Sequence, residues 1–232
     1  IVTKNVNLRV KADALGISAQ DYAVEAIPDF DRYRGWHELE TDSAAIEHLK
    51  EGLSIPVGEL DASPNEYVFA RDRDDPKNAQ VGRTTPGGDI IPLLDTTRTV
   101  CGIRGLNIEQ TFTIDALLDE NIKLVTLAGK AGTGKTLLAI AAGLQQVFGT
   151  ERFHRLLVFR PTMPVSRDLG YLPGDLNEKM RPWMQPVYDA LEFIRSRDRR
   201  GSVRTLPPDV MDCDEISVEP LTYVRGRSIP NQ

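Results

Sequence analysis

The fold of this chain is decided by Gly129-Lys130-Ala131-Gly132-Thr133-Gly134-Lys135-Thr136. The stretch fits G-x-x-x-x-G-K-[ST], the pattern of a loop whose backbone cradles phosphate groups. The apolar run before it, residues 122–128, is typical of a buried strand. The Ala- and Leu-rich run after it, residues 137–144, predicts a buried helix that stops near Gly149. Strand, loop and helix in this order predict an α/β fold with a parallel sheet.

Each residue type in the loop has a chemical reason. Glycines let the backbone curl so that successive N–H groups point at phosphate oxygens, and the helix adds its positive amino-terminal end. Lys135 is expected to reach the β- and γ-phosphates, and the Thr136 hydroxyl to bind Mg²⁺. The alternative is a glycine turn that matches the pattern by chance. The loop therefore predicts binding of a nucleoside triphosphate with Mg²⁺.

Composition limits the partners and the cellular compartment that can be expected for this chain. The 232 residues carry a net charge of −6, so contact with nucleic acid would depend on local basic patches. Cys101 and Cys213 stand in no metal-binding or redox spacing, which favours free thiols in a reducing compartment; a single disulfide is the alternative. No apolar run approaches the length of a membrane span, and no signal peptide is visible. We therefore expect a cytoplasmic protein without membrane contact.

Three segments differ in character. Residues 1–27 contain a predicted helix from about Asn5 to Leu15, closed by Gly16. Residues 28–101 comprise a linker and a small β-rich module, and residues 102–232 an α/β domain. Because the chain starts with Ile1 and stops without a tail, we expect a fragment.

The middle segment shows several strand-like runs. Residues 36–40, 66–70 and 90–91 are strand candidates, and residues 42–53 suit a helix. Tyr67 and Phe69 alternate as in a strand, which fits either core packing or a nucleic-acid-binding barrel. The charged run at residues 71–76 is expected to be a solvated loop.

The last segment continues the α/β pattern. It predicts a helix over residues 108–118 and strands over residues 156–159 and 216–221. Arg160 then lies at the carboxyl end of a strand, the edge where open α/β sheets bind ligands. Pro182 and Pro186 predict a break, leaving residues 187–194 as a separate helix. The arginines between Arg195 and Arg204 indicate a solvated loop or, alternatively, one that faces RNA.

Four separated stretches in residues 102–232 resemble the PhoH-like ATPases. They are the phosphate loop with its flanks at 127–139, Arg160-Pro161 with residues 169–180, residues 186–191, and residues 220–228. The resemblance implies a P-loop NTPase sheet of the helicase type that binds and hydrolyses ATP. It also implies that a strand ending in Asp-Glu-Ala-Gln, which holds Mg²⁺, follows Gln232. Hydrolysis by this chain alone is therefore expected to be weak or absent.

Residues 3–16 resemble the closing helix of a PIN nuclease domain in two-part PIN–PhoH proteins. Such proteins are linked to ATP-driven RNA unwinding and cleavage. The family usually has Asp where this chain has Asn5, and an amide is a poorer ligand than a carboxylate for a hard divalent cation. Asn5 therefore counts against nuclease activity.

The resemblance extends to further site residues. Gln110 is implied to read adenine with its amide, the alternative being an exposed glutamine at a helix start. Arg225 and Arg227 are implied to sense the γ-phosphate or couple its hydrolysis, against simple charge pairing. Arg160, Arg167 and Lys179 are candidates for RNA phosphate contact, and a homo-oligomeric ring is expected. The main rival is a regulatory nucleotide-binding module without unwinding activity; a phosphotransferase acting on a small molecule is less favoured.

Overall fold

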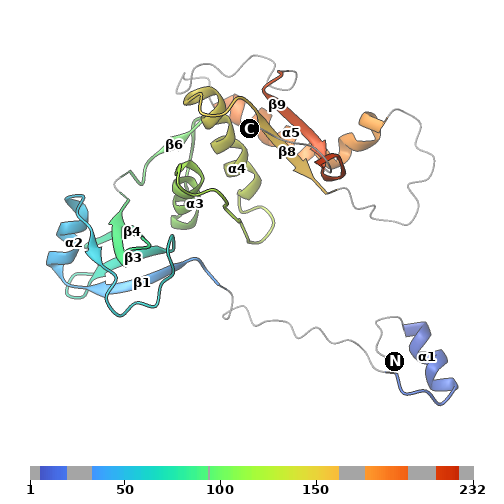
Figure 1. Ribbon diagram of the computed structural model, residues 1–232, viewed down its shortest axis with the longest axis horizontal. Helices are drawn as coiled ribbons and strands as arrows, with labels where there is room; N and C mark the ends of the chain where they lie inside the picture. Colours follow the sequence, from blue (N-terminus) through green and yellow to red (C-terminus); the bar gives the residue numbers. More distant parts are fainter. Residues whose placement is uncertain (1–5, 20–32, 94, 162–175, 198–212, 225–232) are drawn as a thin grey trace. The chain divides into compact units, whose positions relative to one another are not determined.

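The computed structural model describes residues 6–19, 33–93, 95–161, 176–197 and 213–224. The chain forms two compact units, with the boundary in sequence between Pro92 and Leu93 (Figure 1). None of the helices among the described residues is long and apolar enough to cross a membrane.

The first unit begins with helix α1, Val6–Ala14. The helix ends in a turn at Gly16, which has a left-handed φ of 71°. The N–H of Gly16 donates to the carbonyl of Asp13, and that of Ile17 to the carbonyl of Ala12. These bonds satisfy carbonyls at the helix end, so the predicted helix closed by Gly16 is confirmed.

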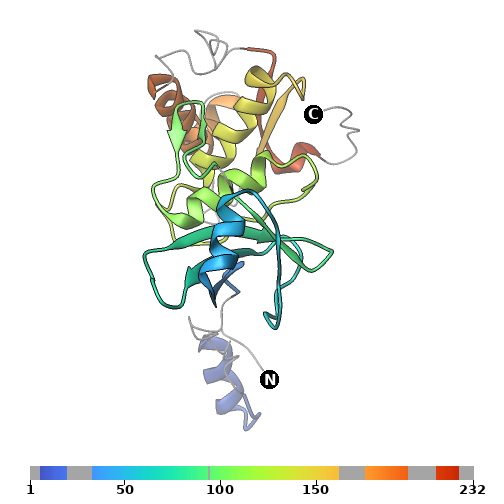
Figure 2. The same cartoon turned by 90° about the vertical axis from the view of Figure 1, so that its left-hand side faces the viewer.

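A curled sheet of five strands forms the rest of this unit, in the order β1-β3-β4-β5-β2. Strand β1 pairs with β3 in parallel, and the other pairs are antiparallel. Helix α2 crosses one face of the sheet (Figure 2). The bounds are β1 Trp36–Thr41, α2 Ser43–Lys50, β2 Ile55–Pro56, β3 Tyr67–Asp72, β4 Ala79–Thr84 and β5 Asp89–Pro92.

The core of this unit lies between α2 and the sheet. Ile46 and Leu49 of α2 pack against Val68 and Ala70 of β3 and Ile90 of β5. Because side chains alternate along a strand, Tyr67 and Phe69 lie on the other face of β3. The strand-like runs and the helix predicted for this segment are thus confirmed, whereas β2 and β4 were not predicted.

The prediction of a solvated loop at residues 71–76 was wrong at its first two residues. Arg71 and Asp72 end β3, and Asp72 is buried. Its carboxylate accepts hydrogen bonds from Ser43 Oγ at 2.5 Å, the Asp74 N–H at 2.9 Å and Asn78 Nδ2 at 3.0 Å. These bonds, that of Ser43 foremost, lower the pKa of Asp72 to about 2. Buried carboxylates need such partners, and here they close the β3–β4 turn.

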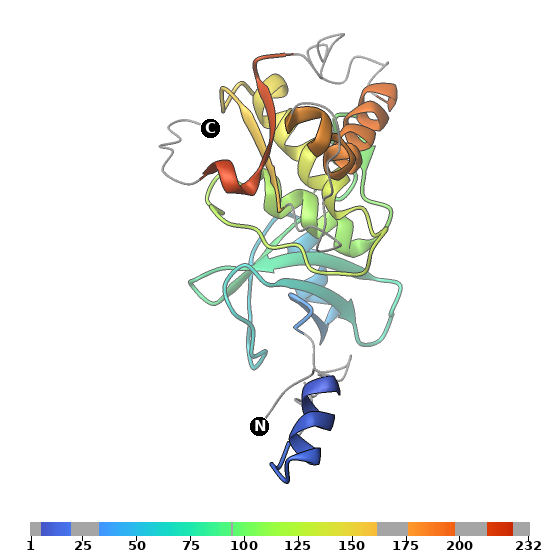
Figure 3. The ribbon, with the colours of Figure 1, turned by 90° about the vertical axis from the view of Figure 1, so that its right-hand side faces the viewer.

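The second unit packs helices against a short parallel pair of strands. Strands β8 and β9 lie side by side with helices α4 and α5 on one face (Figure 3). A hairpin of β6 and β7 precedes helix α3. The bounds are β6 Thr99–Val100, β7 Ile103–Arg104, α3 Ile108–Leu118, α4 Lys135–Leu144, the π-helical turn η2 Gln145–Gly149, β8 Leu156–Arg160, α5 Leu176–Arg197, β9 Ile216–Pro220 and the 3-10 turn η4 Leu221–Val224.

The core of the second unit explains why these elements form. Leu138, Ala141 and Leu144 of α4 and Val187 and Leu191 of α5 are buried in one cluster. Leu156 and Val158 of β8 pack on it from the sheet. The predicted helices at 108–118 and 137–144 and the strands at 156–159 and 216–221 are confirmed.

The strand predicted for residues 122–128 is absent from the structure. A strand requires a neighbour that pairs its backbone groups, and none of the described residues pairs with this segment. Leu124 is 81% exposed, so its apolar side chain is not buried in a sheet. The apolar pattern alone was therefore not sufficient to form a strand here.

The predicted helix break at the two prolines was also wrong. Helix α5 runs without interruption from Leu176 to Arg197. Met184, Val187, Leu191 and Ile194 are buried along one stripe of this helix. Their burial outweighs the hydrogen bonds that Pro182 and Pro186 cannot donate.

Candidate nucleotide-binding site

The loop at residues 129–136 has the backbone that phosphate binding requires. Gly132 and Gly134 have left-handed φ angles of 79° and 85°. A side chain at either position would strain the backbone, which explains the glycines. Gly134 is the N-cap of α4 and offers no capping side chain. The first N–H groups of the helix are therefore available to an anion.

Lys135 lies across this loop. Its Nζ donates to the carbonyl oxygens of Gly129 at 2.9 Å and Lys130 at 2.6 Å, and to Thr133 Oγ1 at 3.2 Å. The ammonium thus sits within the curl of the loop, where a phosphate group would need a cation. Thr136 follows it with an exposed side chain. The roles expected of Lys135 on phosphate and of Thr136 on Mg²⁺ stay predictions.

Helix α4 fixes the position of both residues. Leu138, Ile140, Ala141 and Leu144 are at most 3% exposed, so the helix is anchored along its length. Close contact with β8 adds to this anchoring, because a Cβ at Gly143 would lie 2.7 Å from Leu156 Cδ1. A firmly packed helix holds its amino terminus in place for a ligand.

Gln110 contacts the loop directly. Its Nε2 donates to the carbonyl of Thr133 at 3.2 Å, and its Oε1 accepts from the N–H of Leu106 at 2.8 Å. Asn107 caps α3 through a bond from the Gln110 N–H to its Oδ1 at 2.9 Å. The predicted adenine role of Gln110 stays a prediction, but the glutamine does belong to this site.

The other predicted residues are not brought to the loop within the described part of the chain. Arg160 is the last residue of β8 and pairs with Pro220 of β9. Lys179 lies in the first turns of α5. Asn5, Arg167, Arg225 and Arg227 lie outside the described residues. Their proposed roles therefore stay predictions.

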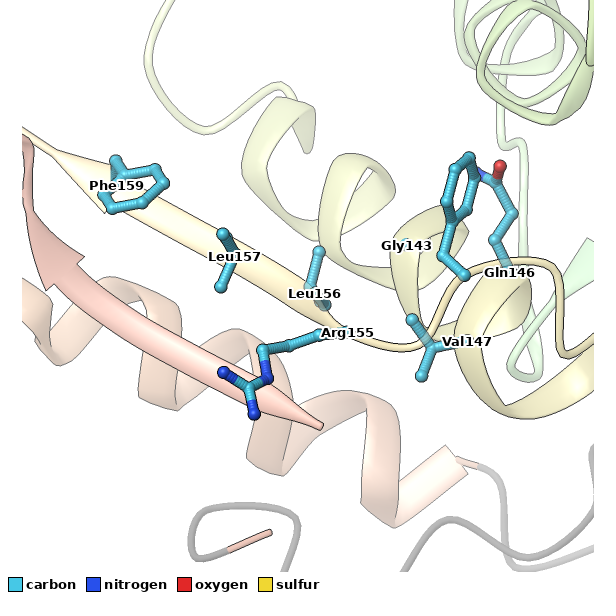
Figure 4. Close-up of a pocket in the computed structure, with 8 residues that line it drawn as sticks. Gly143, Gln146, Val147, Arg155, Leu156, Leu157 and Phe159 are labelled. Carbon is cyan, nitrogen blue, oxygen red and sulfur yellow. The ribbon is translucent and has the colours of Figure 1, made fainter. Parts of the chain in front are cut away.

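A pocket of about 370 Å³ lies away from the phosphate loop. It is formed where α4 and η2 meet the start of β8, with Gly143, Val147, Leu156 and Phe159 among its lining residues (Figure 4). Gly143 lies near the carboxyl-terminal end of α4, about 12 Å along the helix from Lys135 at 1.5 Å per residue. The phosphate loop lies at the other end of the helix and contributes no residue to this pocket, so the pocket is separate from the candidate site.

Mg²⁺ fits the loop in part. The Thr136 hydroxyl is a suitable oxygen ligand next to Lys135. Among the described residues, no three His, Cys, Asp or Glu side chains gather to hold a metal. When bound with the triphosphate, Mg²⁺ neutralises charge on the phosphate oxygens. This chain's own part would be to orient the phosphates through Lys135 and the loop N–H groups.

Thr133, which was predicted to bind ATP as part of the loop, also links the loop internally. Its hydroxyl donates to the Lys130 carbonyl at 2.9 Å and contacts Lys135, while its carbonyl accepts from Gln110. The motif leaves the residue type at this position unspecified, so the sequence did not predict these contacts. At Gly105, a Cβ would lie 2.7 Å from Thr111 Oγ1, which explains a glycine before α3.

Comparison with known proteins finds relatives of a single family. A family model described as PhoH-like protein matches residues 102–232. The chain is 39% identical over 237 residues to Protein PhoH2 of Bacillus subtilis (strain 168), covering 100% of the chain and 53% of that relative. It is 35% identical over 239 residues to Protein PhoH2 of Mycolicibacterium smegmatis, covering 99% of the chain and 50% of the relative. With Protein PhoH of Escherichia coli (strain K12) the identity is 30% over 145 residues, covering 62% and 39%. The chain thus spans about half the length of the PhoH2 relatives.

Proposed function

Because the chain belongs to the PhoH-like protein family, we propose that it binds ATP with Mg²⁺ at residues 129–136 and takes part in ATP hydrolysis. The observation that carries the proposal is the position of Lys135 Nζ, which lies within the loop and contacts Gly129, Lys130 and Thr133. In this proposal the loop N–H groups and Lys135 bind the phosphates, and Thr136 provides a ligand to Mg²⁺.

The test compares ATP turnover of the full-length protein with that of Lys135→Ala. We expect a loss of about a hundredfold or more, the usual effect of removing a group that stabilises developing charge. Lys123→Ala is the matched control, because Lys123 Nζ contacts only the carbonyl of Glu120 in the described structure. Undiminished turnover in Lys135→Ala would contradict the proposal.

The wider proposal is a helicase-like motor that acts on RNA and is coupled to a PIN nuclease domain. Family membership and the PhoH2 relatives support the ATP-dependent part, while RNA action and PIN coupling are extensions of it. Arg160, Arg167 and Lys179 would contact RNA phosphates, and Arg225 and Arg227 would sense the γ-phosphate. Asn5 in place of the usual Asp leads us to expect weak or absent nuclease activity.

A regulatory module that only binds nucleotide is the alternative. RNA would then leave ATP turnover unchanged, and a duplex with a single-stranded overhang would stay paired. Stimulation of turnover by RNA together with strand separation supports the motor.

We also propose that the protein assembles into a homo-oligomeric ring. The proposal rests on the family alone. Native mass measurement over a range of concentrations, with ATP and Mg²⁺, tests it. A monomer at every concentration would remove it.

A further inference from the structure

We infer that Gln110 is a positioning residue for the phosphate loop, and that it strengthens phosphate binding whichever base the nucleotide carries. The inference rests on the proposed function, since it concerns the same loop. It starts from the two ends of one amide: Nε2 donates to the Thr133 carbonyl, and Oε1 accepts from the Leu106 N–H. The side chain therefore bridges the loop and the segment that leads into α3.

The bridge reaches the phosphate-binding cation through one residue. Thr133 receives the Gln110 amide on its carbonyl and holds Lys135 Nζ on its hydroxyl at 3.2 Å. The Gln110 side chain also lies close to Gly134, the next residue, because a Cβ at Gly134 would lie 3.3 Å from Gln110 Nε2. Loss of the amide would free the carbonyl of Thr133 and loosen the curl in which Lys135 lies.

A loop that is ordered before the ligand arrives loses less entropy on binding. The resulting gain in affinity concerns phosphate binding only. Both ends of the Gln110 amide bond to backbone groups of the protein, so neither end is available to contact a base. A residue that reads a base would instead affect one nucleotide more than another. The two roles therefore differ in a measurable way.

Neighbouring residues explain why the bridge forms. Asn107 caps α3 and fixes the backbone of Gln110, and Gly105 permits the tight approach of the preceding segment to Thr111. Both the donor and the acceptor of the amide are thereby aimed at backbone partners. Glutamine is suited to the position, since its amide can donate and accept at once.

The experiment measures the affinity of the protein for Mg·ATP, Mg·GTP and inorganic tripolyphosphate with Mg²⁺. Gln110→Ala and Gln110→Glu are compared with the wild type. Gln110→Glu keeps the size of the side chain and the acceptor for Leu106, but it replaces the donor to Thr133 by an oxygen. We expect each variant to bind all three ligands more weakly by the same factor, about three- to tenfold for one such hydrogen bond.

A second measurement does not depend on the ligand. Hydrogen exchange of the amides in residues 129–136 should be faster in Gln110→Glu than in the wild type without nucleotide. Glu109→Gln is the matched control, because Glu109 is the exposed neighbour of Gln110 in the same turn of α3. It should change neither the affinities nor the exchange.

The outcomes separate this inference from the proposed function. Weaker binding of ATP alone, with GTP and tripolyphosphate unchanged, would make Gln110 a base reader and overturn the inference. Unchanged affinities and unchanged exchange in both variants would also overturn it. If Lys135→Ala binds all three ligands as well as the wild type, the proposed function itself fails, and the inference fails with it.

Discussion

Thr136 directly follows Lys135 and carries an exposed hydroxyl. We predict that Thr136→Val, which keeps the shape but lacks the hydroxyl, weakens binding of Mg·ATP about tenfold or more, as expected when a contact to a charged group is lost. Thr136→Ser should bind as the wild type does. Titrating nucleotide binding with Mg²⁺ and again in excess chelator measures the effect. If Thr136→Val responds to Mg²⁺ like the wild type, the hydroxyl is not a ligand.

Asp72 gives the first unit a defined dependence on pH. Its pKa is about 2 in the folded chain against an ordinary value of 3.8. A depressed pKa in the folded state adds stability above pH 4, and that stability is lost as the pH falls from about 4 to about 2. Ser43, Asp74 and Asn78 all donate hydrogen bonds to the carboxylate oxygens of Asp72, and these bonds are strongest when the carboxylate is charged.

We therefore predict that Asp72→Asn lowers the thermal midpoint at pH 7 and removes part of the fall between pH 4 and pH 2. Midpoints measured by circular dichroism over this range test the prediction. Asp74→Asn is the matched control, because Asp74 is exposed and contributes its backbone N–H to the network. Equal midpoints for Asp72→Asn and the wild type at every pH would contradict it.

A second carboxylate of this unit, at the other end of β3, acts in the same direction. Burial opposes ionisation of Glu66, but hydrogen bonds from Tyr33, His37 and the Ser63 N–H outweigh it and lower the pKa of Glu66. His37 Nε2 lies 2.9 Å from its Oε2. The contact with Glu66 is one cause, after desolvation, that raises the pKa of Tyr33 to about 12. Both carboxylates thus remain charged at neutral pH.

Strands β4 and β5 approach each other closely at Gly82. A Cβ at this position would lie 2.5 Å from Ile90 Cγ2 and 2.8 Å from the Ile91 carbonyl oxygen. We predict that Gly82→Ala lowers the free energy of unfolding by about 1–3 kcal/mol, the usual cost of overpacking. Gly87→Ala is the control, since the heavy atom nearest to a Cβ at Gly87 would be Thr85 Oγ1, at 3.6 Å. Chemical denaturation of both variants measures the difference, and equal midpoints would contradict the prediction.

Local sequence patterns predicted most individual helices and strands. They failed where an element depends on contacts with residues far away in the sequence. Helix α3 begins and ends at the predicted residues because Asn107 caps it and its apolar residues recur with helical spacing. The segment at 122–128 has an equally clear apolar pattern but no paired strand among the described residues. A strand depends on a neighbour far along the chain, which no local pattern reveals.

The same reasoning applies to α5 and to the site. Two prolines predicted a helix break from the local sequence. The burial of Val187, Leu191 and Ile194 in the core of the unit stabilises a continuous helix instead. Lys135 and Thr136 could be named from the motif, since the chemistry fixes their spacing. Thr133 was named only as part of the loop, because its contacts with Gln110 and Lys135 arise only in the folded chain.

Because the whole chain has a net charge of −6, RNA binding would depend on a few lysine and arginine side chains. If Arg160, Arg167 and Lys179 each neutralise one phosphate, as proposed, three contacts at about 0.7 each give a slope of about −2 for log affinity against log salt. We predict this slope for single-stranded RNA. Replacing any one of the three by Gln should reduce its magnitude by about 0.7.

The measurement is a series of RNA titrations between low and physiological salt, by fluorescence anisotropy. Arg152→Gln serves as the control, because Arg152 donates to the Glu120 carbonyl at 3.2 Å and lies 3.9 Å from its carboxylate. It should leave the slope unchanged. A slope near zero would exclude these phosphate contacts, and a slope that no single substitution alters would place the RNA on other residues. In either case the phosphate loop would keep its proposed role, since RNA and triphosphate contact different side chains in this assignment.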